Sequence, residues 1–189
     1  KIIAGVDEVG RGSWAGPVVS AAVILGTFTE VSHLKDSKKL SRTARNNLFN
    51  RLRKKAFLGI GFASVDEIER LNILKATFLS MQRAISSLTI EPDLIMIDGQ
   101  QVPRELENRA IAIVKGDQLV SEISAASIVA KVVRDNHMAL LNNKYPGYFW
   151  DRNVGYGVKA HFLALKSLGI TPSHRRSFKP IHNMLYEEN

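Results

Sequence analysis

The chain contains no cysteine, which excludes disulfide bonds, thiolate catalysis and cysteine-ligated zinc. It has no apolar run long enough to span a bilayer, and its N-terminus shows no basic segment followed by an apolar one. No glycine-rich run ends in Gly-Lys-Ser/Thr, and no Gly-x-Ser-x-Gly elbow is present. The histidines show no paired metal-ligand spacing; they are His33, His137, His161, His174 and His182. We expect a soluble, cytoplasmic protein that contacts no membrane.

Negative charge is scarce relative to positive charge. The 189 residues include 26 Lys and Arg but only 18 Asp and Glu, which gives a formal net charge of +8. A strongly basic balance favours a polyanionic partner, because neutralising phosphates releases counterions. Some soluble proteins are simply basic, so the charge favours nucleic acid without requiring it. The length suffices for one substantial domain, or for a domain with a small appendage.

Apolar runs and periodicities predict an α/β fold. Short apolar runs predict strands over about residues 2–6, 17–25, 57–64, 94–97 and 111–114. Helical spacing predicts helices over about residues 42–56, 73–88, 119–141 and 160–168. Ser64 and Glu67 form a capping box for one more helix, and the turn formers over residues 10–17 predict a hairpin. Strands come first and then alternate with helices, which indicates a mixed sheet with helices on both faces.

Four carboxylates stand at or near the ends of predicted strands. Asp7 and Glu8 follow the first strand, and Asp98 and Asp117 follow two later ones. Ligands of open α/β sheets gather at the carboxyl ends of strands, so these side chains converge if their strands are neighbours. Each also has an ordinary explanation, since Asp7 and Glu8 suit exposed strand-end charges, Asp98 suits a turn and Asp117 suits a helix cap. The recurrence at three strand ends favours a shared site.

Such a site would need a cation, because carboxylates held close together repel one another. Oxygen-only ligands suit Mg²⁺ or Mn²⁺, and two such ions about 3.5–4 Å apart can clamp the attacking and leaving oxygens of a phosphodiester displacement. Adjacent strand residues point to opposite faces, so Asp7 and Glu8 can share a site only where the strand twists or ends. Val9-Gly10 predicts such an end.

Other residues offer contacts to a nucleic acid. Gly10 and Gly12 leave the backbone bare, and Arg11 offers a fork of donors to phosphate. Tyr156, between two glycines, can stack on a sugar or base, although a partly buried loop tyrosine explains it equally well. Two basic clusters occupy predicted loops, where fixed charges often bind a ligand; they are Lys35, Lys38 and Lys39, and His174, Arg175, Arg176 and Lys179. A third, on a predicted helix, suits a solvated face; it is Arg51, Arg53, Lys54 and Lys55.

A polar stripe follows Asp117 at helical spacing; it comprises Ser124, Ser127, Lys131 and Asp135. An ion pair with Arg134 and a supporting role beside the metal ligands explain Asp135 equally well.

In their order along the chain, these motifs resemble those of the type 2 ribonucleases H, the bacterial ribonuclease HII family. The matching blocks are Asp7-Glu8-Val9-Gly10-Arg11-Gly12, Asp36-Ser37-Lys38-Lys39-Leu40, Asn72-Ile73-Leu74, Ile97-Asp98-Gly99, Lys115-Gly116-Asp117, Ser124-Ala125-Ala126-Ser127-Ile128 with Ala130-Lys131-Val132 and Arg134-Asp135, Gly155-Tyr156, and His174-Arg175-Arg176-Ser177-Phe178. Each block is moderately specific, and the ordered set, which spans nearly the whole chain, is very specific. The family usually has proline after Gly-Arg-Gly, whereas this chain has Ser13-Trp14.

The resemblance implies a ribonuclease H-like mixed β-sheet flanked by helices over residues 1–144, with a small helical C-terminal part over 145–189 packed on it. It implies two-metal hydrolysis, and the implied catalytic metal ligands are Asp7, Glu8, Asp98 and Asp117. It implies that the Gly-Arg-Gly residues contact the 2′-hydroxyl of the target ribonucleotide and that the loop tyrosine reads the RNA–DNA junction; these residues are Gly10, Arg11, Gly12 and Tyr156. We further expect substrate contacts from Lys38, Arg175 and Arg176, and supporting roles for Ser127, Lys131 and Asp135.

We therefore expect a Mg²⁺- or Mn²⁺-dependent endoribonuclease that acts in ribonucleotide excision repair. It would hydrolyse RNA in RNA/DNA hybrids and cut 5′ of single ribonucleotides embedded in duplex DNA, leaving 3′-hydroxyl and 5′-phosphate ends. A monomer would suffice. Two alternatives stay open. A non-catalytic basic module that binds hybrid duplexes explains the charge but not the acids at strand ends. A metal-dependent DNA nuclease on a related scaffold would cut an all-DNA duplex, which the expected enzyme would leave intact.

Overall fold

The sheet at the centre of the molecule has the order β3-β2-β1-β4-β5. Its strands, in a computed structural model that describes residues 1–34 and 39–186, are β1 (Ile3–Val9), β2 (Val18–Ile24), β3 (Phe57–Ala63), β4 (Leu94–Asp98) and β5 (Ala110–Ile113). The first three strands pair antiparallel, whereas β4 runs parallel to β1 and β5 runs parallel to β4. The predicted mixed sheet and the predicted hairpin between the first two strands are confirmed.

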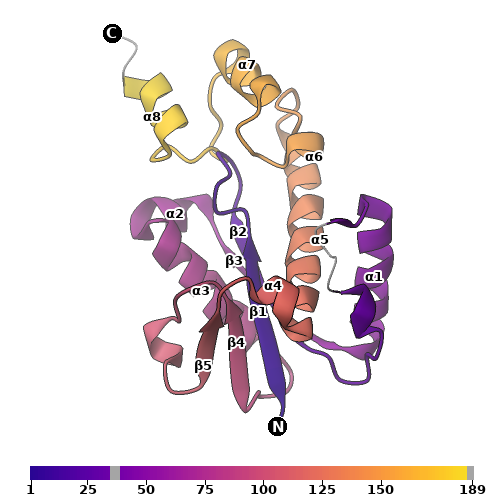
Figure 1. Cartoon of the computed structure of the whole chain (residues 1–189). Coiled ribbons are helices and arrows are strands. Elements are labelled where there is room, and N and C mark those ends of the chain that lie inside the picture. Colours follow the sequence, from indigo (N-terminus) through magenta and orange to yellow (C-terminus); the bar gives the residue numbers. More distant parts are fainter. Residues whose placement is uncertain (35–38, 187–189) are drawn as a thin grey trace.

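Helices cover both faces of this sheet (Figure 1). They are α1 (Arg42–Lys55), α2 (Val65–Leu71), α3 (Ile73–Ser86), α4 (Gly116–Leu119), α5 (Ser121–Lys144), α6 (Trp150–Asn153), α7 (Lys159–Leu168) and α8 (Lys179–Tyr186), with short 3-10 turns at Val31–His33 and Arg104–Leu106. α5 packs on β1 and β2 with α1 beside it, and α3 packs on β2 and β3 with α2 beside it. The fold therefore has three layers, with β1 in the middle of the central one.

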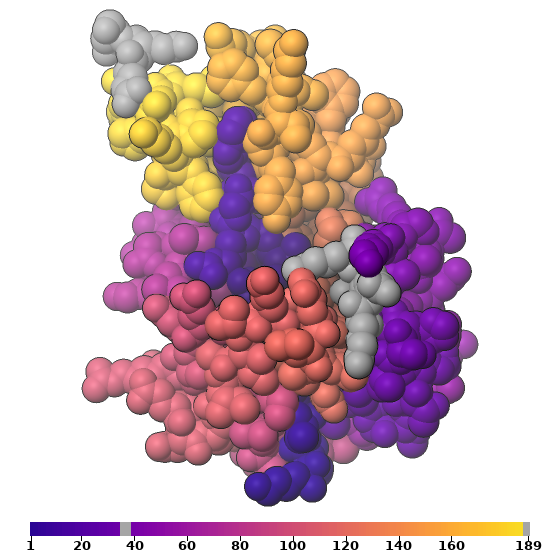
Figure 2. Space-filling view, viewed as in Figure 1, coloured from indigo at the N-terminus to yellow at the C-terminus, as the bar shows by residue number. Residues whose placement is uncertain are grey.

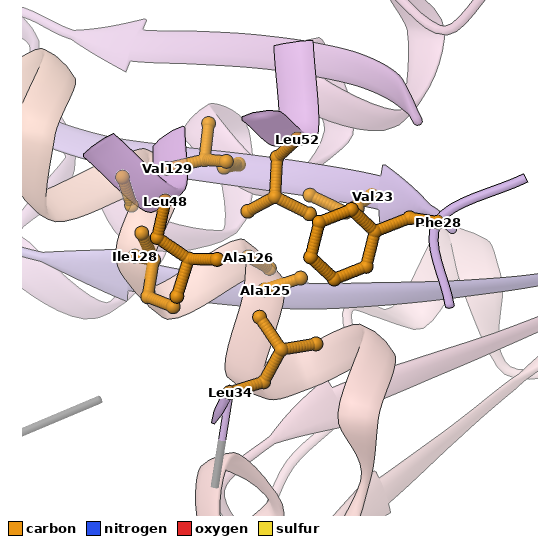
Figure 3. Close-up of a cluster of buried hydrophobic side chains, with 11 residues drawn as sticks. Val23, Phe28, Leu34, Leu48, Leu52, Ala125, Ala126, Ile128 and Val129 are labelled. Atoms are coloured by element: carbon orange, nitrogen blue, oxygen red, sulfur yellow. The ribbon is translucent and has the colours of Figure 1, made fainter. Parts of the chain in front are cut away.

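The alternation of side chains along β2 explains why both faces need covering. Ala21 and Val23 point into a core that α1 and α5 complete, whereas Ala22 points into a second core on the α3 side. Figure 3 shows the first of these cores, where Leu48 and Leu52 of α1 meet the strand and α5. A strand that is buried on both faces reads as a continuous apolar run, and every residue of β2 is buried.

The close approach of α5 to β1 depends on a glycine. A side-chain carbon at Gly5 would lie 2.1 Å from the carbonyl carbon of Glu122, which is far closer than atoms can pack. The small Ala125 and Ala126 of α5 are fully buried on the same face. These residues bring the N-terminal half of α5, with its polar stripe, next to the end of β1.

Local sequence signals set several helix starts. Ser41 accepts a hydrogen bond from the Ala44 amide at 3.2 Å and caps α1. The predicted capping box is present, because Ser64 accepts from the Glu67 amide and the Glu67 carboxylate accepts from the Ser64 amide.

The start of the long helix differs from the prediction. Sequence periodicity placed it at residue 119, but Val120 is extended and separates the short α4 from α5. Lys115 has a positive φ of 56° just before α4. Asp117 consequently lies in the first turn of α4.

The C-terminal elements gather at the far end of α5. Trp150, Leu165 and Ile181 form a buried cluster with Ala15, from the β1–β2 connection, and Met138, from α5. In Figure 2 the indigo N-terminal segment passes between the orange and yellow C-terminal segments. α8 lies in a tail where no individual helix was predicted. The domain boundary at residue 145 stays a prediction.

Over the described ranges, 1–34 and 39–186, no helix is both long and apolar enough to cross a membrane.

Candidate active site

Asp7 and Asp98 lie side by side on neighbouring parallel strands. The register of β1 and β4 pairs Val6 with Ile97, so the next residue along each strand is one of these aspartates. Side chains at matched positions of parallel strands point to the same face. The ends of two strands that are distant in sequence thus bring their carboxylates together. The sequence predicted this convergence on the condition that the strands are neighbours.

Glu8 reaches the same region although it follows Asp7 directly. β1 ends at Val9, just before Gly10 and one residue after Glu8, so Val9-Gly10 marks the strand end as predicted. β4 ends at Asp98, and no β4 residue stands beside Glu8. The Glu8 carboxylate lines the cavity that holds Asp7 and also an adjoining one with Arg11 and Asp98.

A cavity of about 320 Å³ joins these acids to the helices above them. Its wall comprises Asp7, Glu8, Val9, Asp98, Arg45 from α1, and Ser127, Ile128 and Lys131 from α5. Carboxylates from the strands and basic side chains from the helices thus share one cavity. Arg45 was missed by the sequence reasoning, because nothing distinguishes it from other basic residues on an amphipathic helix.

Burial and mutual repulsion perturb the acids. Burial raises the pKa of Asp7 well above its usual range, and the neighbouring charges of Glu8 and Asp98 raise it further. Burial also raises the pKa of Glu8, although Arg11, whose Nη1 lies 3.5 Å from Glu8 Oε1, opposes that shift. Carboxylates kept together at this cost are typical of a site that a cation completes.

Asp117 lies next to this group but not on the cavity wall. It is buried, and its main-chain amide lies 3.4 Å from Asp98 Oδ1. Ser124 of α5 donates a hydrogen bond to the Asp117 carbonyl oxygen, which fixes α4 against α5. The structure therefore brings three of the predicted carboxylates into one cavity and places the fourth beside Asp98.

The chemistry of this donor set fits Mg²⁺ or Mn²⁺. The groups are hard carboxylate oxygens without sulfur or imidazole, and they lie on a cavity that is open to small ions. In the side-chain arrangement seen here, no three His, Asp or Glu residues of the described segments already form a metal cluster.

Two buried arginines hold the Gly-Arg-Gly segment and the connection that follows it. Arg175 donates to the carbonyl oxygens of Gly10, Arg11 and Gly16 at 2.6, 2.9 and 2.9 Å. Arg134 donates to the carbonyl oxygens of Ala15 and Pro17, to the Ser13 hydroxyl and to the Val154 carbonyl oxygen. Both arginines are fully buried.

This burial changes the interpretation of two residues. Arg175 was expected to contact substrate, but its guanidinium lies under the loop and is occupied by main-chain oxygens. Asp135 forms its ion pairs with Lys131, at 2.6 Å, and Arg45, at 4.0 Å, and not with the adjacent Arg134. Asp135 thus orients two basic side chains on the cavity wall.

Tyr156 lies against the Gly-Arg-Gly segment. A side-chain carbon at Gly12 would lie 3.8 Å from the Tyr156 Cε1 atom. The Arg134 guanidinium lies 5.8 Å from the centre of the Tyr156 ring, within range of a cation–π contact. The structure therefore brings together two segments that the sequence singled out separately.

The remaining predicted residues lie in three different settings. Arg176 is exposed next to the buried Arg175, and Ser127 is close enough to Asp7 to lower its pKa by hydrogen bonding. Lys38 lies outside the described residues, as do Asp36 and Ser37 of its sequence block and Lys35 of its basic cluster.

Comparisons with known proteins place the chain in a family. The family model described as Ribonuclease HII matches residues 4–181. A Ribonuclease HII of Roseobacter denitrificans is 51% identical over 186 residues, which cover 98% of this chain and 94% of the relative.

Solved structures share the fold over nearly the whole length. The RNase HII in a PCNA:RNase HII complex from Archaeoglobus fulgidus matches with a TM-score of 0.81 and 28% identity, covering 94% of this chain and 95% of that one. The ribonuclease H2 from Pyrococcus horikoshii OT3 matches with a TM-score of 0.80 and 27% identity, covering all of both chains. The chain belongs to the ribonuclease HII family, whose ribonuclease H endonuclease activity it is expected to share.

Proposed function

We propose that this protein is a divalent-metal-dependent endoribonuclease that hydrolyses RNA in RNA/DNA hybrids and cuts 5′ of single ribonucleotides embedded in duplex DNA. The products would carry 3′-hydroxyl and 5′-phosphate ends. The observation that carries the proposal is the cavity shared by Asp7, Glu8 and Asp98, with Asp117 beside it. We also propose that it works as a monomer in the cytoplasm, in ribonucleotide excision repair.

Four carboxylates would hold the metal ions; they are Asp7, Glu8, Asp98 and Asp117. When bound, a pair of Mg²⁺ or Mn²⁺ ions supplies an activated water and stabilises charge on the attacking and leaving oxygens. The buried position of Asp7 strengthens its attraction for such ions, because electrostatic interactions are stronger away from water. Lys131 and Arg45 on the cavity wall would attract the scissile phosphate.

Selection of RNA over DNA would come from the Gly10–Gly12 segment. The bare backbone of the glycines lets a ribose approach closely, and the 2′-hydroxyl is the group that distinguishes RNA at the cut site. Arg175 fixes this segment through the Gly10 carbonyl oxygen. Tyr156, which lies against Gly12, would stack on the sugar at the RNA–DNA junction.

The decisive test uses a DNA duplex with one ribonucleotide, incubated with and without Mg²⁺. We expect a single nick on the 5′ side of the ribonucleotide, only when the metal is present. An all-DNA duplex of the same sequence should stay intact. Nicking that survives EDTA, or no nicking in Mg²⁺ or Mn²⁺, would favour the non-catalytic binding module, and cleavage of the all-DNA duplex would favour a DNA nuclease.

A further inference from the structure

A pair of buried histidines faces each other beneath the Tyr156 turn, outside the carboxylate cavity. His161 and His174 are 0% and 1% exposed, and their Nε2 atoms lie 3.1 Å apart. Neither was assigned a role in the chemistry above. The His161 Nδ1 atom lies 3.0 Å from the main-chain oxygen of Tyr156, which connects this pair to the residue proposed to read the junction.

The hydrogen-bond partners define which nitrogen of His161 carries its proton. The Trp150 indole N–H can only donate, and it lies 3.2 Å from His161 Nε2. Nε2 must therefore accept, and a neutral imidazole then carries its proton on Nδ1. From that position His161 donates to the Tyr156 carbonyl oxygen.

The same reasoning fixes His174. The Thr171 main-chain amide donates to His174 Nδ1 at 2.8 Å, so the proton of His174 lies on Nε2 and points at His161. The result is a chain of hydrogen bonds in which each group donates to the next, from the Thr171 amide through His174 and His161 to the Tyr156 carbonyl oxygen. Burial lowers the pKa of both imidazoles, that of His174 to about 3, which keeps this chain neutral near pH 7.

Trp14 also holds this turn. Its main-chain amide donates to the Gly155 carbonyl oxygen at 2.9 Å. Its indole lies 5.5 Å from the His161 ring and covers Gly157 so closely that a side-chain carbon there would lie 2.1 Å from a ring atom. The residues before and after Tyr156 are thus both fixed by Trp14, and Tyr156 itself is fixed by His161.

We propose that His161 and Trp14 are positioning residues that hold the Tyr156 ring against Gly12, at the place where a ribose would enter. The inference rests on the proposed function, since it assumes that Tyr156 contacts substrate. It also gives Trp14 a role, because its indole supports the tyrosine turn from within the connection that follows Gly-Arg-Gly.

The test compares two amides at position 161. In His161→Asn the amide nitrogen falls near the place of Nδ1 and can still donate to the Tyr156 carbonyl oxygen, whereas in His161→Gln it falls near Nε2 and cannot. kcat and KM are measured on a duplex with one embedded ribonucleotide and on a continuous RNA/DNA hybrid. His137→Leu is the matched control, because His137 is a half-buried α5 histidine that packs on Phe62.

We expect His161→Gln to raise KM on the single-ribonucleotide duplex about fivefold to tenfold, with a smaller change on the hybrid. His161→Asn and His137→Leu should stay within about twofold of the unmodified protein on both substrates. In a Tyr156→Ala background, His161→Gln should cause no further rise in KM, because the two changes remove the same contact with the substrate.

Equal losses on both substrates, additivity with Tyr156→Ala, or equal impairment by the two amides would overturn the inference. If His161→Gln does not fold, Gly157→Ala at an exposed position serves instead, since its side chain displaces Trp14; it should show the same selective, non-additive loss. Failure of the proposed function looks different, because the unmodified protein would then leave the single-ribonucleotide duplex uncut.

Discussion

The Nη2 atom of Arg175 donates a 2.6 Å hydrogen bond to the carbonyl oxygen of Gly10, across 165 residues of chain. The C-terminal segment thereby fixes the loop that follows the first two acids. An arginine fork can satisfy several oxygens at once, and a lysine ammonium cannot reproduce that geometry.

Arg175→Lys should lower the free energy of unfolding by about 2–3 kcal/mol, because buried carbonyl oxygens lose their donors. It should also reduce cleavage of the single-ribonucleotide duplex, since the Gly-Arg-Gly segment is no longer fixed. Urea denaturation and single-turnover cleavage measure the two effects. Arg83→Lys is the control, because Arg83 also donates to a main-chain oxygen, that of Phe62, but is exposed and does not line the cavity. A stable Arg175→Lys protein with full activity would contradict this role.

Asp98→Asn should abolish turnover while largely keeping duplex binding. The change removes a carboxylate from the cavity without removing a basic contact. Gel-shift binding and cleavage in Mg²⁺ separate the two properties, and Asp66→Asn, an exposed acid on α2, serves as the control for lost charge. Loss of binding together with turnover would count against a metal-ligand role.

Tyr156→Ala should lower activity most on a single embedded ribonucleotide. Stacking of a base or sugar on an aromatic ring contributes about 1–3 kcal/mol, which corresponds to roughly fivefold to 150-fold in affinity. A continuous hybrid offers other contacts and should lose less. The measurement is kcat/KM on both substrates, and equal losses would refute a junction-reading role.

Acid should destabilise the protein through its buried histidines. The pKa of His174 falls from an ordinary value of 6.5 to about 3 on folding, so only the unfolded chain takes up this proton between those values. The contribution of His174 to the free energy of unfolding is therefore complete above about pH 6.5. As the pH falls toward 3, the free energy of unfolding decreases by about 1.4 kcal/mol per pH unit.

Urea denaturation from pH 4.5 to 7.5 measures the slope of the free energy of unfolding against pH. In His174→Asn the slope should be smaller by up to about 1.4 kcal/mol per pH unit, whereas replacement of the exposed His182 by Asn should leave it unchanged. The same slope in all three proteins would show that His174 takes up its proton equally in the folded and unfolded states.

Much of the fold follows from local signals in the sequence. The Ser64–Glu67 capping box, the apolar run of β2 and the turn formers between β1 and β2 act over a few residues, so their consequences can be read directly. Motif order alone also gave the family. The extra break at Val120 could not be read, because helical periodicity continues through it.

The candidate site likewise combines features that the sequence shows with features that only the tertiary structure creates. That Asp7 and Asp98 follow apolar strands is a property of the sequence, but that these strands are neighbours in parallel register is a property of the sheet. Arg175 reads as one of several basic loop residues, and Arg45 as one of several on a helix. Only tertiary packing buries Arg175 under Gly10 and places Arg45 on the cavity wall with the acids.

The amino-acid sequence by itself thus determined the kinds of groups available and the elements that carry them, because propensities, caps and periodicities are short-range. The tertiary structure alone decided which basic side chains lie at the cavity, which lie buried as supports, and which proton faces the Tyr156 carbonyl oxygen. Those outcomes depend on contacts between residues far apart in the chain, and such contacts have no local signature.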